Sequence, residues 1–234
     1  MRKNANENNH QRLLTLWIAI SLSLGGSAMA EEFPLTMPPA IESAPTLAAP
    51  VAQGSFDGVI QDLATRFPQY DHTKFILIDA TSQELILVVQ GAEKGRWTIS
   101  TAAKGVGSKK GSDQTPLGVH RIVTKIGDNA PLGTVFKARA NTGRVARILT
   151  EPGARSGEDN VTTRIMWLDG LEPGLNKGGD VDSKQRFIYI HGTDEEGRLG
   201  APASHGCIRM RNQDVVDLFN QVDNDTLVVI TQRK

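Results

Sequence analysis

Residues 74–90, KFILIDATSQELILVVQ, decide the fold class, because two β-branched and apolar runs flank a short polar ATSQ segment. This pattern predicts a β-hairpin. Further strand-like runs follow along the chain, at 96–102, 119–127, 134–140, 144–150, 163–169, 186–192 and 226–231. Gly- and Pro-rich turns separate several of them. Strands at this spacing predict a mainly β chain, built as a β-sandwich or a strongly twisted mixed sheet.

Two segments have helical periodicity instead. In 212–222, NQDVVDLFNQV, apolar residues recur at spacings of three and four, which predicts an amphipathic helix. Asn212 is expected to cap that helix, and Asp214 suits its positive dipole end. A shorter helix is expected over 56–67, and a loop over the glycine-rich stretch 104–118.

The first thirty residues have the pattern of a secretory signal peptide. Three basic residues precede an apolar run at 13–24, and the small-residue triplet Ala28-Met29-Ala30 follows it. The alternative is an uncleaved membrane anchor, but twelve helical residues span only ~18 Å, which is short for a bilayer. We therefore expect cleavage after Ala30 and a periplasmic protein.

Residues 31–72 are expected to form a linker with the short helix near its end, since 31–54 hold five of the eleven prolines. The remaining 73–234 are expected to form one domain. After cleavage the chain would carry 23 basic and 25 acidic residues, a net charge of −2. A nearly neutral chain lacks the net positive charge that would attract nucleic acid.

Cys207 is the only cysteine, and it lies in SHGCIRM, 204–210, downstream of YIHGT, 189–193. A single cysteine in an exported chain indicates a reactive thiol or an intermolecular bridge. Only the thiolate attacks well, so His205 or His191 is expected to act as its base and to hold its pKa below about 8.5. Backbone N–H groups around Gly206 suit an oxyanion, and the carbonyl of Gly192 can fix the imidazole tautomer.

Two other interpretations of these residues stay open at this point. His191, His205 and Cys207, with a carboxylate such as Asp194, are legitimate zinc ligands, although the usual C-x₂-C and H-x₃-H pairs are absent. The cysteine could also be buried and inert. His72, at the end of the expected linker, and His120, in the expected domain, are expected to be half-exposed structural residues.

The segments IHGT…SHGCIRM and GSDQTPLGVHRI resemble the signature of the YkuD-type L,D-transpeptidases, which are bacterial cell-wall enzymes. The resemblance covers about residues 73–232. It implies a mainly β catalytic domain, a curved sandwich or mixed sheet with a short helical cap. It also implies that Cys207 attacks the third residue of a peptidoglycan stem tetrapeptide, usually meso-diaminopimelate, and that D-Ala leaves while a thioester remains.

The same resemblance assigns roles to the neighbouring residues and needs no cofactor or metal. His191 would be the base, oriented by Gly192. Ser204, His205 and Gly206 would shape the pocket and the oxyanion hole. Arg209 would either steady the cysteine loop or meet a substrate carboxylate.

The acceptor for the thioester defines the reaction. A stem-peptide amine gives a 3–3 crosslink, a lipoprotein lysine gives an anchored protein, and water makes the enzyme an L,D-carboxypeptidase or hydrolase. Carbapenem-type inhibitors are further expected partners. Loops 151–160 and 170–186 are expected to wall the acceptor groove. A non-catalytic peptidoglycan-binding protein is the alternative of another class.

Overall fold

The computed structural model describes residues 55–233, so the expected signal peptide and nearly all of the Pro-rich segment lie outside the described residues. The helices are α1 (Asp57–Arg66), η1 (Gly179–Val181), η2 (Glu196–Arg198) and α2 (Asn212–Gln221), of which η1 and η2 are short 3-10 turns. The strands are β1 (Lys74–Asp79), β2 (Glu84–Val89), β3 (Ala92–Ser100), β4 (Gly118–Ile126), β5 (Thr134–Lys137), β6 (Ala140–Val145), β7 (Val161–Gly170), β8 (Tyr189–Thr193), β9 (Ile208–Met210) and β10 (Leu227–Thr231).

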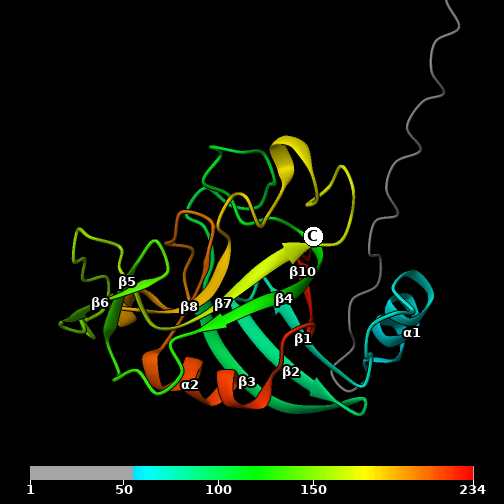
Figure 1. Ribbon diagram of the computed structural model, residues 1–234, viewed down its shortest axis with the longest axis horizontal. Coiled ribbons are helices and arrows are strands. Elements are labelled where there is room, and N and C mark those ends of the chain that lie inside the picture. The colour runs from blue at the N-terminus through cyan, green and yellow to red at the C-terminus, as the bar shows by residue number, and fades with distance from the viewer. Residues whose placement is uncertain (1–54, 234) are drawn as a thin grey trace, which may run out of the picture. The chain divides into compact units, whose positions relative to one another are not determined.

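All ten strands belong to one mixed sheet, in the order β4-β10-β1-β2-β3-β9-β8-β7-β5-β6 (Figure 1). An additional antiparallel pairing between β4 and β7 joins the sheet back on itself, so eight strands form a closed ring. The hairpin of β5 and β6 extends beyond β7. Two pairings are parallel, β1 with β10 and β8 with β9. The described chain is therefore mainly β, as the sequence predicts.

The β1–β2 hairpin explains why its sequence is apolar almost throughout. Ile76 and Ile78 belong to a core cluster drawn from all eight ring strands and from α2. Phe75 and Leu77 face the other way, into a cluster that includes Leu63 of α1. Because both faces of the hairpin are covered, apolar residues occupy nearly every position instead of alternating with polar ones.

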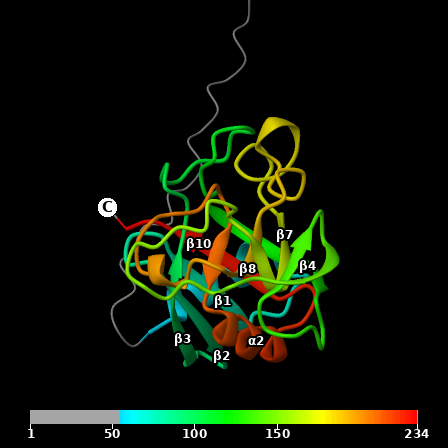
Figure 2. The ribbon, with the colours of Figure 1, turned by 90° about the vertical axis from the view of Figure 1, so that its left-hand side faces the viewer.

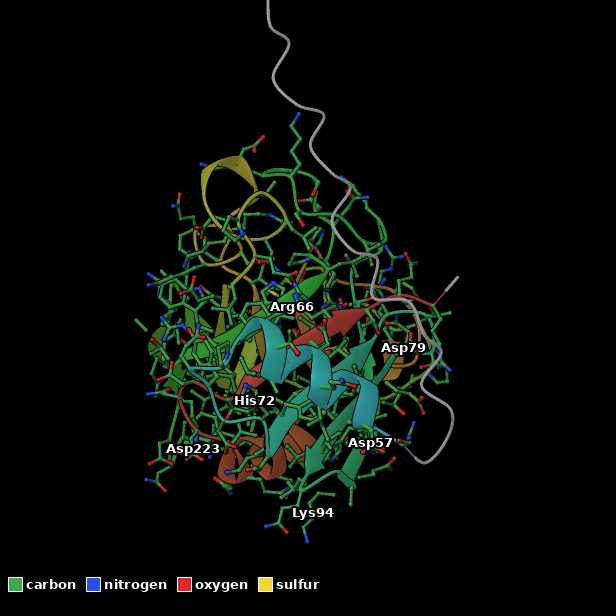
Figure 3. The ribbon with its side chains drawn as sticks, turned by 90° about the vertical axis from the view of Figure 1, so that its right-hand side faces the viewer. Asp57, Arg66, His72, Asp79, Lys94 and Asp223 are labelled. Atoms are coloured by element: carbon green, nitrogen blue, oxygen red, sulfur yellow. The ribbon has the colours of Figure 1, made fainter. Side chains whose placement is uncertain are left out.

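Helix α1 lies across the outer face of the sheet, and Figure 3 shows it over the strands with Arg66 near its end. The helix expected over 56–67 is therefore present. It packs on the sheet, so the folded part of the described residues begins before residue 73. No helix within residues 55–233 is long and apolar enough to cross a membrane.

Three expectations about local structure are wrong. The run 134–140 is not one strand, because β5 ends at Lys137 and β6 begins at Ala140. Only the last two residues of β6 fall in the predicted strand 144–150, because Ala146 and Leu149 donate their N–H groups to the backbone of Gly133 and Asp194 as loop contacts. Asn212 is the first residue of α2 and not its cap. Its side chain is buried, and its backbone N–H donates to Glu196 Oε1 at 2.8 Å.

His120 is also not the half-exposed residue that was expected. It is fully buried on β4, with Nε2 2.9 Å from Ser183 Oγ and Nδ1 3.1 Å from the carbonyl of Gly118. Burial lowers the pKa of His120 to about 4. His72 is half-buried, as expected.

Candidate active site

Strands β8 and β9 position the two residues of the predicted catalytic pair. They run parallel, with His191 opposite Arg209 and Ile190 opposite Ile208. Ile190 and Ile208 face the main core, so His191 and Arg209 face the opposite side, because successive strand residues alternate. Cys207 immediately precedes β9, two residues before Arg209, which is the strand partner of His191. A two-residue offset between adjacent strands corresponds to a Cα separation of roughly 8 Å.

Ser204 and Thr115 hold the turn that carries the thiol. Ser204 Oγ donates to the carbonyl of Cys207 at 2.6 Å and accepts from the N–H of Gly206 at 3.2 Å. Thr115 Oγ1 donates to the carbonyl of Gly206 at 3.0 Å and accepts from the N–H of Ala102 at the same distance. The T-P-L-G segment therefore braces the cysteine turn from the side. No feature of the sequence around Thr115 marks this role.

Gly206 is required at its position by conformation and by space. Its φ is +130°, a value that L side chains rarely adopt. A Cβ there would approach Ile188 Cδ1 to 3.2 Å and the carbonyl oxygen of Gln114 to 3.3 Å. Because Gly206 has no side chain, its backbone stays uncovered next to Cys207.

His191 is held as one tautomer. The ring is 2% exposed, and Nδ1 lies 2.7 Å from the carbonyl oxygen of Gly192. A carbonyl only accepts hydrogen bonds, so Nδ1 carries the proton and Nε2 keeps its lone pair. Burial lowers the pKa of His191 to about 4, which leaves the imidazole neutral at pH 7. The expected contact between His191 and the Gly192 carbonyl is present.

The thiol of Cys207 is not activated in the way the sequence suggested. Its Sγ lies 3.4 Å from the carbonyl oxygen of Phe187, and the residue packs against the aromatic cluster around Tyr189. Burial raises the pKa of Cys207 to about 11, and the negative charge of Asp159 adds to the rise. The nearby cations lower this pKa too little to compensate. This shift runs opposite to the expected pKa below about 8.5, and both the thiol and the imidazole are neutral at pH 7.

Arg209 is enclosed by acidic side chains. It is 1% exposed, forms an ion pair with Asp159, and places Nη1 3.1 Å from Glu195 Oε2. The other oxygen of Asp159 lies 2.5 Å from Nδ1 of His205, which is 70% exposed at the surface. Of the two roles left open for Arg209, these contacts favour steadying the cysteine turn.

Asp159 joins loop 151–160 to both sides of the cysteine motif. Burial works to raise the pKa of Asp159, but the charge of Arg209 and the hydrogen bond with His205 hold it below its ordinary value. The sequence indicated the loop but not this residue. Its partners lie 46 and 50 positions away, and no local pattern marks such a pairing.

A hollow of about 180 Å³ adjoins the cysteine motif between loop 151–160 and the segment before Ser204. It is lined by Gly153, Gly197, Arg198, Leu199, Ala201, Pro202 and Ala203. A slightly larger hollow, of about 220 Å³, borders Lys74 and Asp223 and shares no lining residue with the cysteine motif. The smaller hollow also contains no residue of the cysteine motif, but its lining ends at Ala203, one residue before Ser204.

The structure holds His191 against the Gly192 carbonyl on β8, places Cys207 in the turn immediately before the neighbouring strand β9, and leaves His205 exposed at that turn. Within residues 55–233, no group of three or more His, Cys, Asp or Glu side chains is arranged to hold a metal ion. Figure 2 views the described residues from the side of the β5–β6 hairpin and shows β8 beside β7, with α2 at one end of the sheet.

Comparison with known proteins identifies the family. YkuD of Bacillus licheniformis is 49% identical over 49 residues, which cover 21% of this chain and 29% of that protein. The solved L,D-transpeptidase of Xylanimonas cellulosilytica is 18% identical with a TM-score of 0.43, over 68% of this chain and 60% of that one. L,D-transpeptidase 3 of Mycobacterium tuberculosis, solved with a faropenem-derived adduct, is 15% identical with a TM-score of 0.42, over 68% and 60%.

The family model of the L,D-transpeptidase catalytic domain matches residues 73–230, which is more than half of the chain. On that match, the protein belongs to the YkuD family of L,D-transpeptidase catalytic domains.

Proposed function

We propose that this protein is a cysteine-dependent L,D-transpeptidase that acts on peptidoglycan stem tetrapeptides through a thioester at Cys207. One observation carries the proposal beyond family membership. His191 lies on β8, Cys207 immediately precedes the parallel neighbouring strand β9, and the Gly192 carbonyl leaves His191 Nε2 free to accept a proton. A thiol with a neutral imidazole of fixed tautomer beside it is the arrangement that general-base-assisted acyl transfer needs.

The acylation step follows from the charge states of the pair. Because the resting thiol is protonated, His191 Nε2 takes the Sγ proton as the sulfur adds to the carbonyl of the third stem residue. The carbonyl oxygen becomes an oxyanion, which backbone N–H groups around Gly206 and Cys207 would receive. The intermediate collapses when the C–N bond to D-Ala breaks. The departing amine takes the proton from the imidazolium, and a thioester remains.

The second step reverses the proton path. An acceptor amine attacks the thioester carbonyl and gives its proton to His191. Cys207 then leaves as the thiol, and a new amide bond is formed. If water attacks instead, the products are a tripeptide and free enzyme, which is the L,D-carboxypeptidase alternative.

The anchoring of loop 151–160 favours transfer over hydrolysis. Asp159 holds one end of the loop against the cysteine turn, and Ser156 donates from its backbone to Glu195 Oε1 at 2.8 Å. A loop fixed in this way can wall an acceptor groove and exclude water, which otherwise competes at about 55 M. The proposed acceptors are a second stem-peptide amine or a lipoprotein lysine, and carbapenem-type lactams are proposed to acylate the same thiol.

The N-terminal pattern supports a periplasmic location for this chemistry, since the substrate lies outside the cytoplasm. The test of the proposed function is to incubate the enzyme with disaccharide tetrapeptides at rising concentration and to identify the products by mass spectrometry. A transferase should shift from tripeptide toward 3–3 crosslinked dimers. Tripeptide at every concentration, without dimers, would make the carboxypeptidase the correct reading, and no turnover would reject the proposal.

A further inference from the structure

The tip of the β5–β6 hairpin is a two-residue turn made of residues that rarely form one. Lys137 pairs with Ala140, which leaves Ala138 and Arg139 as the loop. Both have positive φ, +48° and +71°, a conformation usually taken by Asn-Gly pairs in such turns. In Figure 1 this hairpin lies at one side of the sheet, next to β7 and β8. The unusual turn fixes where the Arg139 side chain begins.

Arg139 is held by aromatic rings. Its guanidinium carbon lies 4.6 Å from the ring centroid of Trp167 and 5.1 Å from that of Phe187. Nη1 donates to the hydroxyl of Tyr189 at 3.1 Å. The rings of Phe187 and Tyr189 are themselves 6.1 and 6.0 Å from Trp167. Cation–π contacts hold a guanidinium between such ring faces, and its remaining N–H groups stay available to donate hydrogen bonds to a ligand.

This aromatic group reaches the nucleophile directly. The carbonyl of Phe187 lies 3.4 Å from Sγ of Cys207, and the cysteine packs against the cluster that contains Tyr189 and Trp167. Phe187 is 50% exposed, which is unusual for a large apolar side chain in this structure. The platform of Trp167, Phe187 and Tyr189 therefore extends from the thiol to solvent, with Arg139 on top of it.

The charge on Arg139 is uncompensated within residues 55–233. Its contacts there are the rings of Trp167 and Phe187 and the hydroxyl of Tyr189, and no carboxylate pairs with it. Lys184 adds a second cation, with Nζ 5.8 Å from the Trp167 ring. By contrast, Arg209 forms ion pairs with Asp159 and Glu195. An unpaired, planar cation next to the reacting centre fits a planar anion in the substrate.

We infer that Arg139 is a specificity-determining residue that binds a carboxylate of the peptide donor beside Cys207. The inference rests on the proposed function. A guanidinium can grip a carboxylate with two parallel hydrogen bonds, which gives geometry as well as affinity. A stem tetrapeptide offers two carboxylates near the attacked bond. One is the terminal carboxylate of the fourth residue, and the other is the side-chain carboxylate of a diamino acid at the third.

The test measures kcat/KM for acylation with three donors: the unmodified tetrapeptide, the same peptide amidated at its C-terminus, and the peptide amidated on the third side chain. Each is tested with the unsubstituted enzyme, with Arg139→Gln and with Lys137→Gln. Lys137 is exposed on the same hairpin, so its variant removes one charge without touching the platform. Amidating the recognised carboxylate should slow the unsubstituted enzyme about 10- to 100-fold, the range for a hydrogen-bonded ionic contact.

In Arg139→Gln, the unmodified donor should already show that loss, and amidation of the same carboxylate should cost little more. The identity of the sensitive amide shows which carboxylate is bound. Lys137→Gln should discriminate as the unsubstituted enzyme does. Equal losses on all three donors would make Arg139 a structural residue only, and a loss no larger than that of Lys137→Gln would also overturn the inference.

Two further readouts keep the outcome clear. Thermal unfolding of each variant identifies any loss of folding, and if Arg139→Gln does not fold, Arg139→Lys replaces it. Lysine keeps the charge but not the planar fork, so it should retain only part of the discrimination. If the unsubstituted enzyme turned over none of the donors, the proposed function would fail instead of the assignment of Arg139 alone.

Discussion

Replacing Asp159 by asparagine should loosen the cysteine turn while Cys207 and His191 themselves stay unsubstituted. Asp159 is the only described acid that contacts both Arg209 and His205, and Arg209 is 1% exposed. The substitution keeps the shape of the side chain and removes its charge. Arg209 is then left buried with a single carboxylate, Glu195 at 3.1 Å.

The loss in the free energy of unfolding depends on how well the remaining carboxylate and solvent stabilise the charge of Arg209. Removing one partner of a buried ion pair typically destabilises by ~3–5 kcal/mol. Asp159 is 29% exposed and Glu195 stays in place, so solvent screening and the remaining pair favour the low end, about 3 kcal/mol or less. For a chain of this size that corresponds to a fall in Tm of roughly 6–12 °C. The negative charge of Asp159 also raises the pKa of Cys207, so the thiol of the variant should ionise at lower pH.

The assays are denaturant unfolding and the pH dependence of thiol alkylation. Glu158→Gln is the matched control, because Glu158 is the neighbouring acid, is exposed, and pairs with Arg144 instead. The control should leave both the unfolding midpoint and the alkylation profile unchanged. If Asp159→Asn behaved like Glu158→Gln in both assays, the bridge between loop 151–160 and the cysteine turn would have no energetic role.

The remaining predictions concern the catalytic pair, acid stability and export. Because burial raises the pKa of Cys207 to about 11, iodoacetamide should alkylate it slowly at pH 7, and a rate that saturates below pH 8.5 would reject the neutral-pair description. His191→Ala should slow acylation by roughly 10²-fold or more, measured by single-turnover mass spectrometry, whereas an unchanged rate would exclude it as the base. Burial lowers the pKa of His120 and of His191 to about 4. As the pH falls below about 6.5, these histidines therefore bind protons in the unfolded chain before they do so in the folded chain. Each should lower the free energy of unfolding by about 2 kcal/mol between pH 7 and pH 5. Urea titrations of the parent and of His120→Gln should show a shallower pH dependence in the variant; equal slopes would contradict the buried neutral state. N-terminal sequencing of exported protein should begin at Glu31, and a full-length membrane-bound form as the sole product would reject cleavage after Ala30.

The strands of the core could be predicted from the sequence because buried strands consist mostly of apolar residues. In β1 and β2 nearly every residue is apolar, and the structure covers both faces of that hairpin. Segment 144–150 has a similar local pattern, but its residues after Val145 are held by loop contacts with distant backbone. A local pattern does not show which partner a backbone group finds, and this is why the sequence places at 144–150 a strand that lies at Ala140–Val145.

The same limit applies to the site. The motif indicated Cys207, His191 and the Gly192 carbonyl, because these residues are close in sequence and their chemistry is specific. The ionisation of the thiol could not be predicted, since burial among aromatic side chains outweighs the nearby cations only once the chain is folded. Asp159 was missed for a related reason: its role exists only through the path of loop 151–160.

The most direct measurement is the mass of the enzyme during turnover. Purified protein is mixed with tetrapeptide donor without acceptor, quenched in acid within one turnover, and analysed intact and after proteolysis. We expect a mass increase equal to the donor minus D-Ala, located on the peptide that contains Cys207 and removed by hydroxylamine, as a thioester requires. Cys207→Ser should give no thioester adduct. Product formation by a Cys207→Ala variant, or an adduct on any other residue, would show that Cys207 is not the acyl-accepting nucleophile.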